Sequence, residues 1–260
     1  MNGLILHCGG ELKSREEVFS VPVPQATASY VPLPYESLIT RIEKQLAVEG
    51  ITVKEEHLAL SKNGQRMFGL LGIEIPSHTT GEYRCVLGLR NSYDKSMSTG
   101  LCVGARVIVC DNLSFNGEVT FARKHTANLL RDLSWLIAET VTQLPAKFVA
   151  QSATFNVYRS AQITDRDAHD LIVRMTDEGV LNIGDVRNVL KEWRTPQHQE
   201  FADCGKNAWR LFNATTEVLK GDVWRLPTRT TRLHDLLNRA VGTAGVDCVN
   251  PPPLASPVKN

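Results

Sequence analysis

The sequence predicts an α+β protein in which an antiparallel β-sheet with a long packed helix is followed by a helical C-terminal half. Three observations lead to this fold class. Residues 51–123 alternate between apolar and polar positions and are interrupted by short turns. From residue 126 onward, the apolar positions recur at helical spacing instead. With 260 residues and a hydrophobic content of 42%, the chain is also long enough to bury a sizeable core.

Residues 1–34 are predicted to form an extended, proline-rich N-terminal arm. The stretch VPVPQATASYVPLP contains four prolines, whose fixed φ and missing N–H suit an extended segment lying on a surface. A helix is predicted to begin at Pro34 and to end at Gly50, because Leu38, Ile42 and Leu46 fall on one face. This helix opens an α+β core that we expect to span residues 35–155.

Two β-hairpins are predicted after this helix. Asn63 and Gly64 lie between two strand-like runs, and this dipeptide favours a type I′ turn, in which both central residues have positive φ. Residues 83–123 then predict two apolar strands joined by a polar, charged turn, with a second turn after the later strand. The four strands are expected to pair in an antiparallel sheet.

Helices are predicted for the remainder of the folded chain. A stripe of leucine, isoleucine and valine side chains predicts a helix over residues 126–143, and helical character continues towards residue 160. A helical region over residues 156–245 is expected to pack on the core, with Thr164 as an N-cap and Gly179 at a helix end. The proline-rich tail, residues 246–260, is predicted to be disordered.

The charge of the chain is nearly balanced, with a net charge of +1 and a pI near 7.7. This balance argues against a general polyanion-binding coat, so contact with nucleic acid has to be local. Between residues 84 and 131 there are seven basic and three acidic residues, a net charge of +4. The basic residues are Arg84, Arg90, Lys95, Arg106, Arg123, Lys124 and Arg131, and the acidic ones are Asp94, Asp111 and Glu118. A basic hairpin on a near-neutral chain indicates an anionic partner.

The residues expected to contact nucleic acid are Arg90, Asn91, Ser92, Lys95, Arg106, Arg123 and Lys124. Those in the turn offer cations and hydrogen-bond donors that would hold a phosphate backbone without reading bases. The alternative is a solvated turn, for which Asn, Ser and Asp are ordinary residues. Arg123, Lys124 and His125 precede the long helix, where a phosphate or an exposed strand end are equally compatible. Arg106 lies in an apolar run, which favours a pair with an acidic neighbour.

No motif in the sequence indicates catalysis. Neither HExxH, GxxxxGK[ST], GxGxxG nor GxSxG occurs, so we expect no catalytic residues, no cofactor and no metal site. An enzyme would require Asp94, Asp111 and His125 to converge in space. The six cysteines form no CxxC pair and are expected to be reduced in a cytoplasmic protein. No signal peptide and no membrane-spanning stretch is apparent.

Aromatic residues in the C-terminal half have two interpretations. Trp193, Trp209, Phe212 and Trp224 lie among basic residues, a combination with which single strands are held by stacking. At helical spacing, however, tryptophans more often anchor a core, and we favour that interpretation. His198 and His234 flank the helix that carries Trp209, and neither is expected to be a ligand.

Two segments resemble a prokaryotic family catalogued as domain of unknown function 932, whose members are often encoded by phages or plasmids. The first segment, LGLRNSYDKSMSTGLCVGARVIVCDNLSF, matches at Arg90, Asn91, Ser92, Asp94, Ser96, Gly104, Cys110 and Asn112. The second, NAWRLFNATTEVL, matches at Trp209, Asn213, Ala214 and Thr216. The resemblance extends over about residues 35–235. It implies a mobile-element protein in a bacterial cytoplasm, but no activity.

The predicted order of elements also resembles the core of single-strand annealing recombinases. That resemblance implies DNA in a basic groove and assembly into rings, and it rests on topology alone. We therefore expect a nucleic-acid-binding protein, with single-stranded DNA binding or annealing as its function and a homo-oligomer as its form. The alternative is a phage protein that binds a host protein, such as a defence component, without catalysis.

Overall fold

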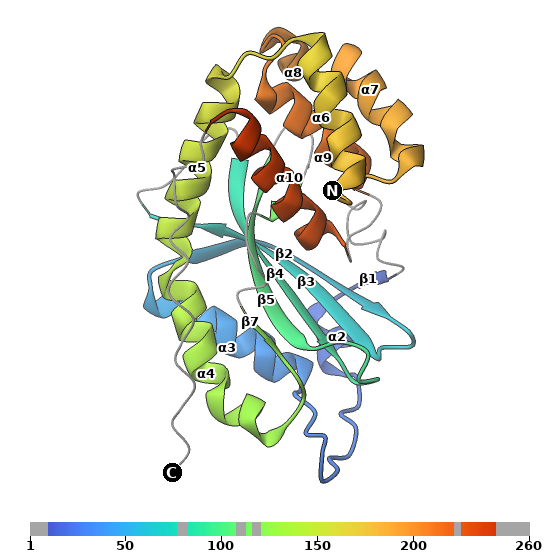
Figure 1. Cartoon of the computed structure of the whole chain (residues 1–260). Coiled ribbons are helices and arrows are strands. Elements are labelled where there is room, and N and C mark those ends of the chain that lie inside the picture. The colour runs from blue at the N-terminus through green and yellow to red at the C-terminus, as the bar shows by residue number, and fades with distance from the viewer. Residues whose placement is uncertain (1–9, 77–82, 108–112, 116–120, 221–224, 243–260) are drawn as a thin grey trace, which may run out of the picture.

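A seven-stranded antiparallel sheet occupies the N-terminal half of the chain, and helices form the C-terminal half (Figure 1). The predicted α+β class is therefore confirmed. The computed structural model describes residues 10–76, 83–107, 113–115, 121–220 and 225–242. The predicted disordered tail, residues 246–260, lies outside the described residues. No helix within the described ranges combines the length and apolarity needed to cross a membrane.

The sheet has the strand order β1-β2-β3-β4-β5-β6, and β7 also pairs with β5. Its strands are β1 (Glu11–Lys13), β2 (Thr52–Ser61), β3 (Arg66–Glu74), β4 (Tyr83–Ser92), β5 (Thr99–Val107), β6 (Leu113–Phe115) and β7 (Phe121–Arg123). Each consecutive pair is antiparallel, so both predicted hairpins are confirmed. The first hairpin has a wider turn than expected, because Lys62, Asn63 and Gly64 all adopt positive φ.

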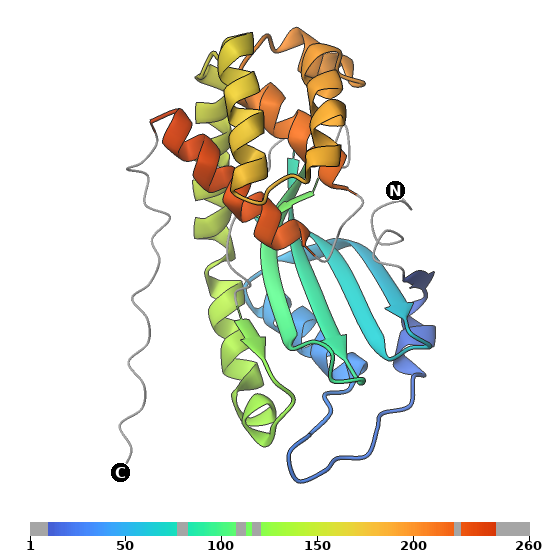
Figure 2. The ribbon, with the colours of Figure 1, turned by 45° about the vertical axis from the view of Figure 1, so that its right-hand side comes forward.

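The helices cover one face of the sheet and one end of the molecule (Figures 1 and 2). They are α2 (Arg15–Phe19), α3 (Tyr35–Val48), α4 (Ala127–Thr142), α5 (Leu144–Ser160), α6 (Asp165–Asp177), the 3-10 helix η1 (Ile183–Asp185), α7 (Val186–Arg194), α8 (Gln199–Asp203), α9 (Ala208–Leu219) and α10 (Leu226–Ala240). α3 and α4 lie against the sheet, and α5 leads from the sheet to the remaining helices. The domain boundary expected at residue 155 falls inside α5.

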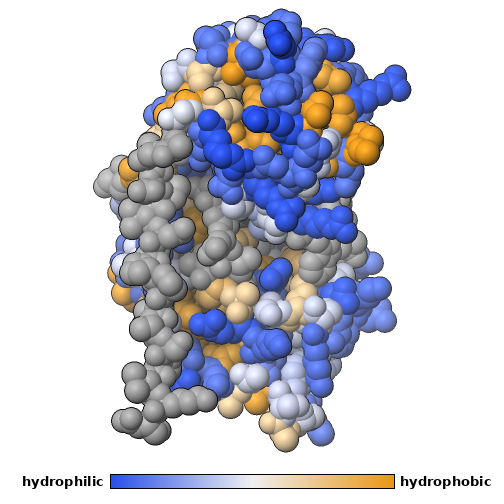
Figure 3. All heavy atoms as spheres, viewed as in Figure 1, coloured by the Kyte–Doolittle hydropathy of each residue, from blue (hydrophilic) through white to orange (hydrophobic). Residues whose placement is uncertain are grey.

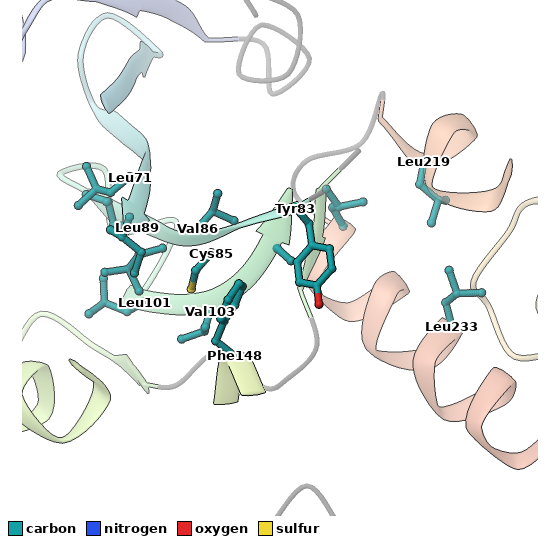
Figure 4. Close-up of a cluster of buried hydrophobic side chains, with 14 of the residues drawn as sticks. Leu71, Tyr83, Cys85, Val86, Leu89, Leu101, Val103, Phe148, Leu219 and Leu233 are labelled. Atoms are coloured by element: carbon teal, nitrogen blue, oxygen red, sulfur yellow. The ribbon is translucent and has the colours of Figure 1, made fainter. Parts of the chain in front are cut away.

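One hydrophobic core joins the sheet to the helices. Successive side chains of β4 point to opposite faces of the sheet, and Tyr83, Cys85 and Leu89 face the helices. The Tyr83 ring lies 5.7 Å from that of Phe148 on α5 (Figure 4). Leu219 and Leu233 extend the same core into α9 and α10 (Figure 4). The described cysteines, Cys85, Cys102 and Cys204, are free, as predicted.

Within the predicted extended arm, Glu11–Lys13 form the strand β1 and Arg15–Phe19 form the helix α2. Ser14 begins α2 with a capping box, in which its hydroxyl accepts from the Glu17 N–H and the Glu17 carboxylate accepts from the Ser14 N–H. Arg15 then donates to the carboxylates of Glu43 on α3 and Glu56 on β2, each at 3.0 Å. These ion pairs hold α2 against the core, and the sequence contains no local sign of them. Residues 20–34 lack helix and strand, apart from an isolated bridge between Thr27 and Tyr30.

Candidate nucleic-acid interface

The turns of both hairpins lie together with the start of α4 on the lower side of the sheet in Figures 1 and 2. The backbone N–H of Tyr93 donates to the carbonyl of Gln65 at 2.7 Å, which joins the two turns. The N–H of Val31 donates to the carbonyl of His125 at 2.9 Å, which joins the loop before α3 to the segment before α4. We call this region the hairpin end: residues 20–34, 62–66, 90–99 and 121–126, with the first turns of α3 and α4.

Asn91 is the centre of a buried hydrogen-bond network at the hairpin end. Its side-chain N–H donates to the Leu33 carbonyl at 2.7 Å, and its oxygen accepts from the Ser92 N–H and the Thr99 hydroxyl, both at 2.9 Å. Asn91, Ser92 and Thr99 are fully buried. Asn91 and Ser92 were predicted to contact nucleic acid, but their side chains are held inside the protein. Their place in the structure makes them positioning residues for the turn.

His125 completes this network from the segment that precedes α4. Its Nε2 lies 2.6 Å from the Asn91 oxygen and 3.1 Å from the Thr99 hydroxyl. Because the Asn91 oxygen can only accept, His125 carries its proton on Nε2. Burial lowers the pKa of His125, so the ring is neutral at pH 7. The network therefore adds no charge to the hairpin end.

Three tyrosines hold the turns in place beneath the surface. The rings of Tyr35 and Tyr93 are stacked with their centroids 4.1 Å apart. The Tyr35 hydroxyl donates to the Gly64 carbonyl at 2.9 Å, and the Tyr30 hydroxyl donates to the Tyr93 carbonyl at 3.1 Å. Tyr30 also lies beneath Lys95, whose Nζ is 4.6 Å from the centre of the ring. Lys95 is exposed and has a positive φ of 63°.

Asp94 is tied to its own turn and to β3. Its carboxylate accepts from Arg66 Nε at 2.6 Å and from the Ser96 N–H at 3.0 Å. Burial opposes the charged form, but the hydrogen bonds from Ser96 and Arg66 outweigh it and lower the pKa of Asp94. Asp94 is thus a charged turn residue that has a partner. It does not meet His125 in a catalytic pair, and Asp111 lies outside the described residues.

Arg90 lies on the opposite face of the sheet from Asn91. It is half-buried, and its Nε is shielded from solvent without a hydrogen-bond partner. It pairs in register with Phe68 and Gly100, which offer no carboxylate. No ion pair connects Arg90 to any residue in the described ranges. The guanidinium of Arg90 is therefore not neutralised by a carboxylate of the described residues.

Arg123 and Lys124 are exposed at the entry to α4. Arg123 is opposite Thr99 in the pairing of β7 with β5, which places it at the end of the turn between β4 and β5. Thr126 is the N-cap of α4, but its side chain makes no capping hydrogen bond. The first N–H groups of α4 are therefore not capped by that side chain, and the positive end of the helix dipole adds to the two cations.

Arg106 does not belong to the hairpin end, although it was predicted to be part of the same site. Six residues separate it from Gly100 along β5, which corresponds to about 20 Å. Arg106 Nη2 donates to Glu55 at 2.7 Å, and Arg84 donates to the same carboxylate at 2.5 Å. The prediction that Arg106 pairs with an acidic neighbour is confirmed. Arg106 is separated from the hairpin end because the two lie near opposite ends of the extended strand β5.

The hairpin end carries six cations and two acids, a net charge of +4. The cations are Lys62, Arg66, Arg90, Lys95, Arg123 and Lys124, and the acids are Glu36 and Asp94. Lys62 and Arg66 were missed from the sequence, because they belong to the other hairpin. The signal that could have found them is the Asn63-Gly64 turn, which exposes its flanking residues at the end of the same sheet.

The C-terminal segment that carried the second resemblance is part of the core. Trp209 and Phe212 are 4% and 0% exposed, and Trp193 is fully buried, so the interpretation as core anchors is confirmed for these three. Trp224 lies outside the described residues. His234 is buried against the Tyr158 hydroxyl at 3.0 Å. Within the ranges that the structure describes, no three His, Cys, Asp or Glu side chains are grouped to hold a metal ion.

Comparison with known proteins gives one match. A family model with the description "Domain of unknown function (DUF932)" matches residues 25–241. Neither the curated proteins nor the solved structures gave a match. The matched range contains the hairpin end from residue 25 onward, the sheet from β2 onward and the helical half.

Proposed function

We propose that this chain, which belongs to the family described as "Domain of unknown function (DUF932)", binds single-stranded nucleic acid at its hairpin end. The observation that carries the proposal is the state of the cations there. Lys62, Arg123 and Lys124 are exposed and Lys95 rests on an aromatic ring, yet none of the four forms an ion pair with a described residue. On a chain with a net charge of only +1, such a local excess favours a polyanion.

The arrangement fits contact with phosphates more than readout of bases. Lysine and arginine side chains on turns hold a nucleic-acid backbone, whereas sequence readout needs side chains that reach base edges in a groove. The buried network around Asn91 fixes the turn between β4 and β5, which carries Lys95, and Arg123 lies opposite Thr99, the first residue of β5. Sequence-tolerant binding of a single strand, including binding that promotes annealing, agrees with this chemistry.

The proposal is tested by the salt dependence of binding to a labelled single-stranded oligonucleotide. Each phosphate contact with a single strand contributes about 0.7 to the slope of log K against log salt. The triple variant Lys95→Ala, Arg123→Ala, Lys124→Ala is therefore expected to lower the slope by about 2. Equal slopes for the variant and the natural chain would show that the hairpin end is not the site.

A matched control removes charge from the helical half. Arg166 and Lys191 are exposed on α6 and α7, and neither forms an ion pair with a described residue. The double variant Arg166→Ala, Lys191→Ala is expected to leave the slope unchanged. A loss of slope in this control equal to that of the triple variant would indicate binding by overall charge and would refute a local site.

The proposal also covers the cellular location and the oligomeric state of the protein. We place the protein in the cytoplasm of a bacterial host, as a phage- or plasmid-encoded factor, and expect it to work as a homo-oligomer. The mass of the protein measured with and without the oligonucleotide tests the second statement. A monomer in both samples would exclude a ring of the annealing type.

A second candidate function is contact with a host protein through the helical half. Hydrophobic side chains gather on its surface (Figure 3), and Val173 and Ile183 are 57% and 85% exposed. Exposed apolar groups of this kind are typical of protein contacts. A complex recovered from host lysate that survives nuclease treatment, together with no binding to oligonucleotides, would favour this function over the first.

A further inference from the structure

Trp135 on α4 is an exposed aromatic side chain close to the hairpin end. It is 51% exposed, whereas Trp193 and Trp209 are 0% and 4% exposed. Tryptophans are usually largely buried, so an indole with half of its surface in water is available to a ligand. The sequence placed the aromatic residues for base stacking in the C-terminal half, and burial removes Trp193 and Trp209 from that role.

Trp135 lies on the side of α4 that carries the ion pair between Arg131 and Asp132. Arg131 and Asp132 lie one turn before it on the same side of the helix, because residues three and four apart are neighbours. Arg131 Nε donates to the Asp132 carboxylate at 2.7 Å. This hydrogen bond, with a smaller effect from the charge of Arg123, lowers the pKa of Asp132. Asp132 therefore lies near enough to Arg123 to feel its charge, and its own charge is balanced by Arg131.

We propose that Trp135 is a base-stacking residue for the single strand that the hairpin end binds, an inference that rests on the proposed function. The phosphates lie against Arg123 and Lys124, and the strand continues past Arg131 to the indole. From Ala127 to Trp135 the helix rises by about 12 Å. Cations that hold the backbone beside an aromatic face that takes a base are the usual elements of single-strand binding.

An acidic residue beyond Trp135 on α4 limits how far a bound single strand can follow the helix. Glu139 lies one turn further along the same side of α4 and forms no ion pair with a residue in the described ranges. A carboxylate in this state repels phosphates, so the strand ends or turns away at Trp135. Arg123 and Lys124 lie before the indole and Glu139 lies after it, so the proposed interface has a basic end and an acidic end.

The test compares two ligands of equal charge, a deoxythymidine oligonucleotide and an abasic strand of the same length. The variant Trp135→Ala is expected to weaken binding of the first by about 5- to 150-fold, the equivalent of one stacked base. Binding of the abasic strand and the salt slope are expected to stay unchanged, because no phosphate contact is lost. Trp135→Phe keeps a stacking face and is expected to restore most of the affinity.

Leu130→Ala is the matched control. Leu130 is 40% exposed on the same helix, but about 140° around it from Trp135, and the variant is expected to bind both strands as the natural chain does. Quenching of tryptophan fluorescence by the deoxythymidine strand, present in the natural chain and reduced in Trp135→Phe, is a second measurement that does not depend on the alanine variant folding.

Three results would overturn the inference. Trp135→Ala that binds the deoxythymidine strand as tightly as the natural chain excludes stacking. An equal loss of affinity for the abasic strand assigns the effect to folding or to phosphate contacts. A lower oligomeric mass with unchanged affinity assigns Trp135 to contact with a second copy. If the natural chain binds neither strand, the proposed function itself is refuted.

Discussion

Replacement of Asn91 by alanine is expected to loosen the hairpin end without removing any contact with nucleic acid. The side chain is fully buried and takes part in four hydrogen bonds. After its removal, the His125 N–H can still donate to the Thr99 hydroxyl, which lies at 3.1 Å. The Ser92 N–H and the Leu33 carbonyl, however, lose the partner that Asn91 gives them.

Each buried polar group left without a partner costs about 1–3 kcal/mol. Two such groups therefore predict a loss of about 2–6 kcal/mol in the free energy of unfolding of the Asn91→Ala variant. This is a large fraction of the roughly 5–15 kcal/mol by which a domain is usually stable. Urea unfolding followed by far-UV circular dichroism measures the loss as a lower midpoint.

Asn128→Ala is the control for this measurement, since Asn128 is exposed in the first turn of α4 and its side chain makes no hydrogen bond to a described residue. Its change is expected to stay within about 0.5 kcal/mol. A loss below about 1 kcal/mol for Asn91→Ala would show that the network does not hold the turn. The salt slope of nucleic-acid binding, measured where the variant is folded, is expected to equal that of the natural chain.

Two further predictions concern stability elsewhere in the fold. Burial lowers the pKa of His234 from 6.5 to about 4, so between these pH values the unfolded chain binds a proton that the folded chain does not. The free energy of unfolding is therefore expected to fall by up to about 3 kcal/mol as the pH drops from 6.5 to 4, which urea unfolding at both pH values measures. The same pH dependence in the His234→Phe variant would contradict this prediction. Arg106→Ala is expected to lower the free energy of unfolding by roughly 1–2 kcal/mol, because it removes one partner of Glu55. The salt slope of nucleic-acid binding is expected to stay unchanged, and a reduced slope would show that Arg106 contacts the nucleic acid.

Local sequence signals predicted most elements correctly. The apolar stripe that begins at Leu129 predicted α4, and Thr164 caps α6 as expected, because helices depend on residues three and four apart. The Asn63-Gly64 turn predicted the first hairpin for a similar reason, since positive φ is a property of the residues themselves. β1 and α2 were missed, because Arg15 is held by Glu43 and Glu56, which are distant in the sequence.

The candidate site was predicted only in part. The sequence identified the basic hairpin and placed Arg90, Lys95, Arg123 and Lys124 on it. It could not separate the residues that point outward from those that point inward. Asn91 and Ser92 are polar turn residues by composition, but the carbonyl of Leu33 and the imidazole of His125 give them partners inside the protein. Such partners come from segments that only folding brings together.

The α+β class, the order of the main helices and hairpins and the family could all be predicted from the chain alone, because periodicity and turn chemistry act over a few residues. Which charges lie close together depends on the folded arrangement. It joined the turn that carries Lys62 to the second hairpin, placed Arg106 near the far end of β5 and left Trp135 exposed on α4. Burial and ion pairing depend on what packs against a side chain, and those neighbours lie far away in the sequence.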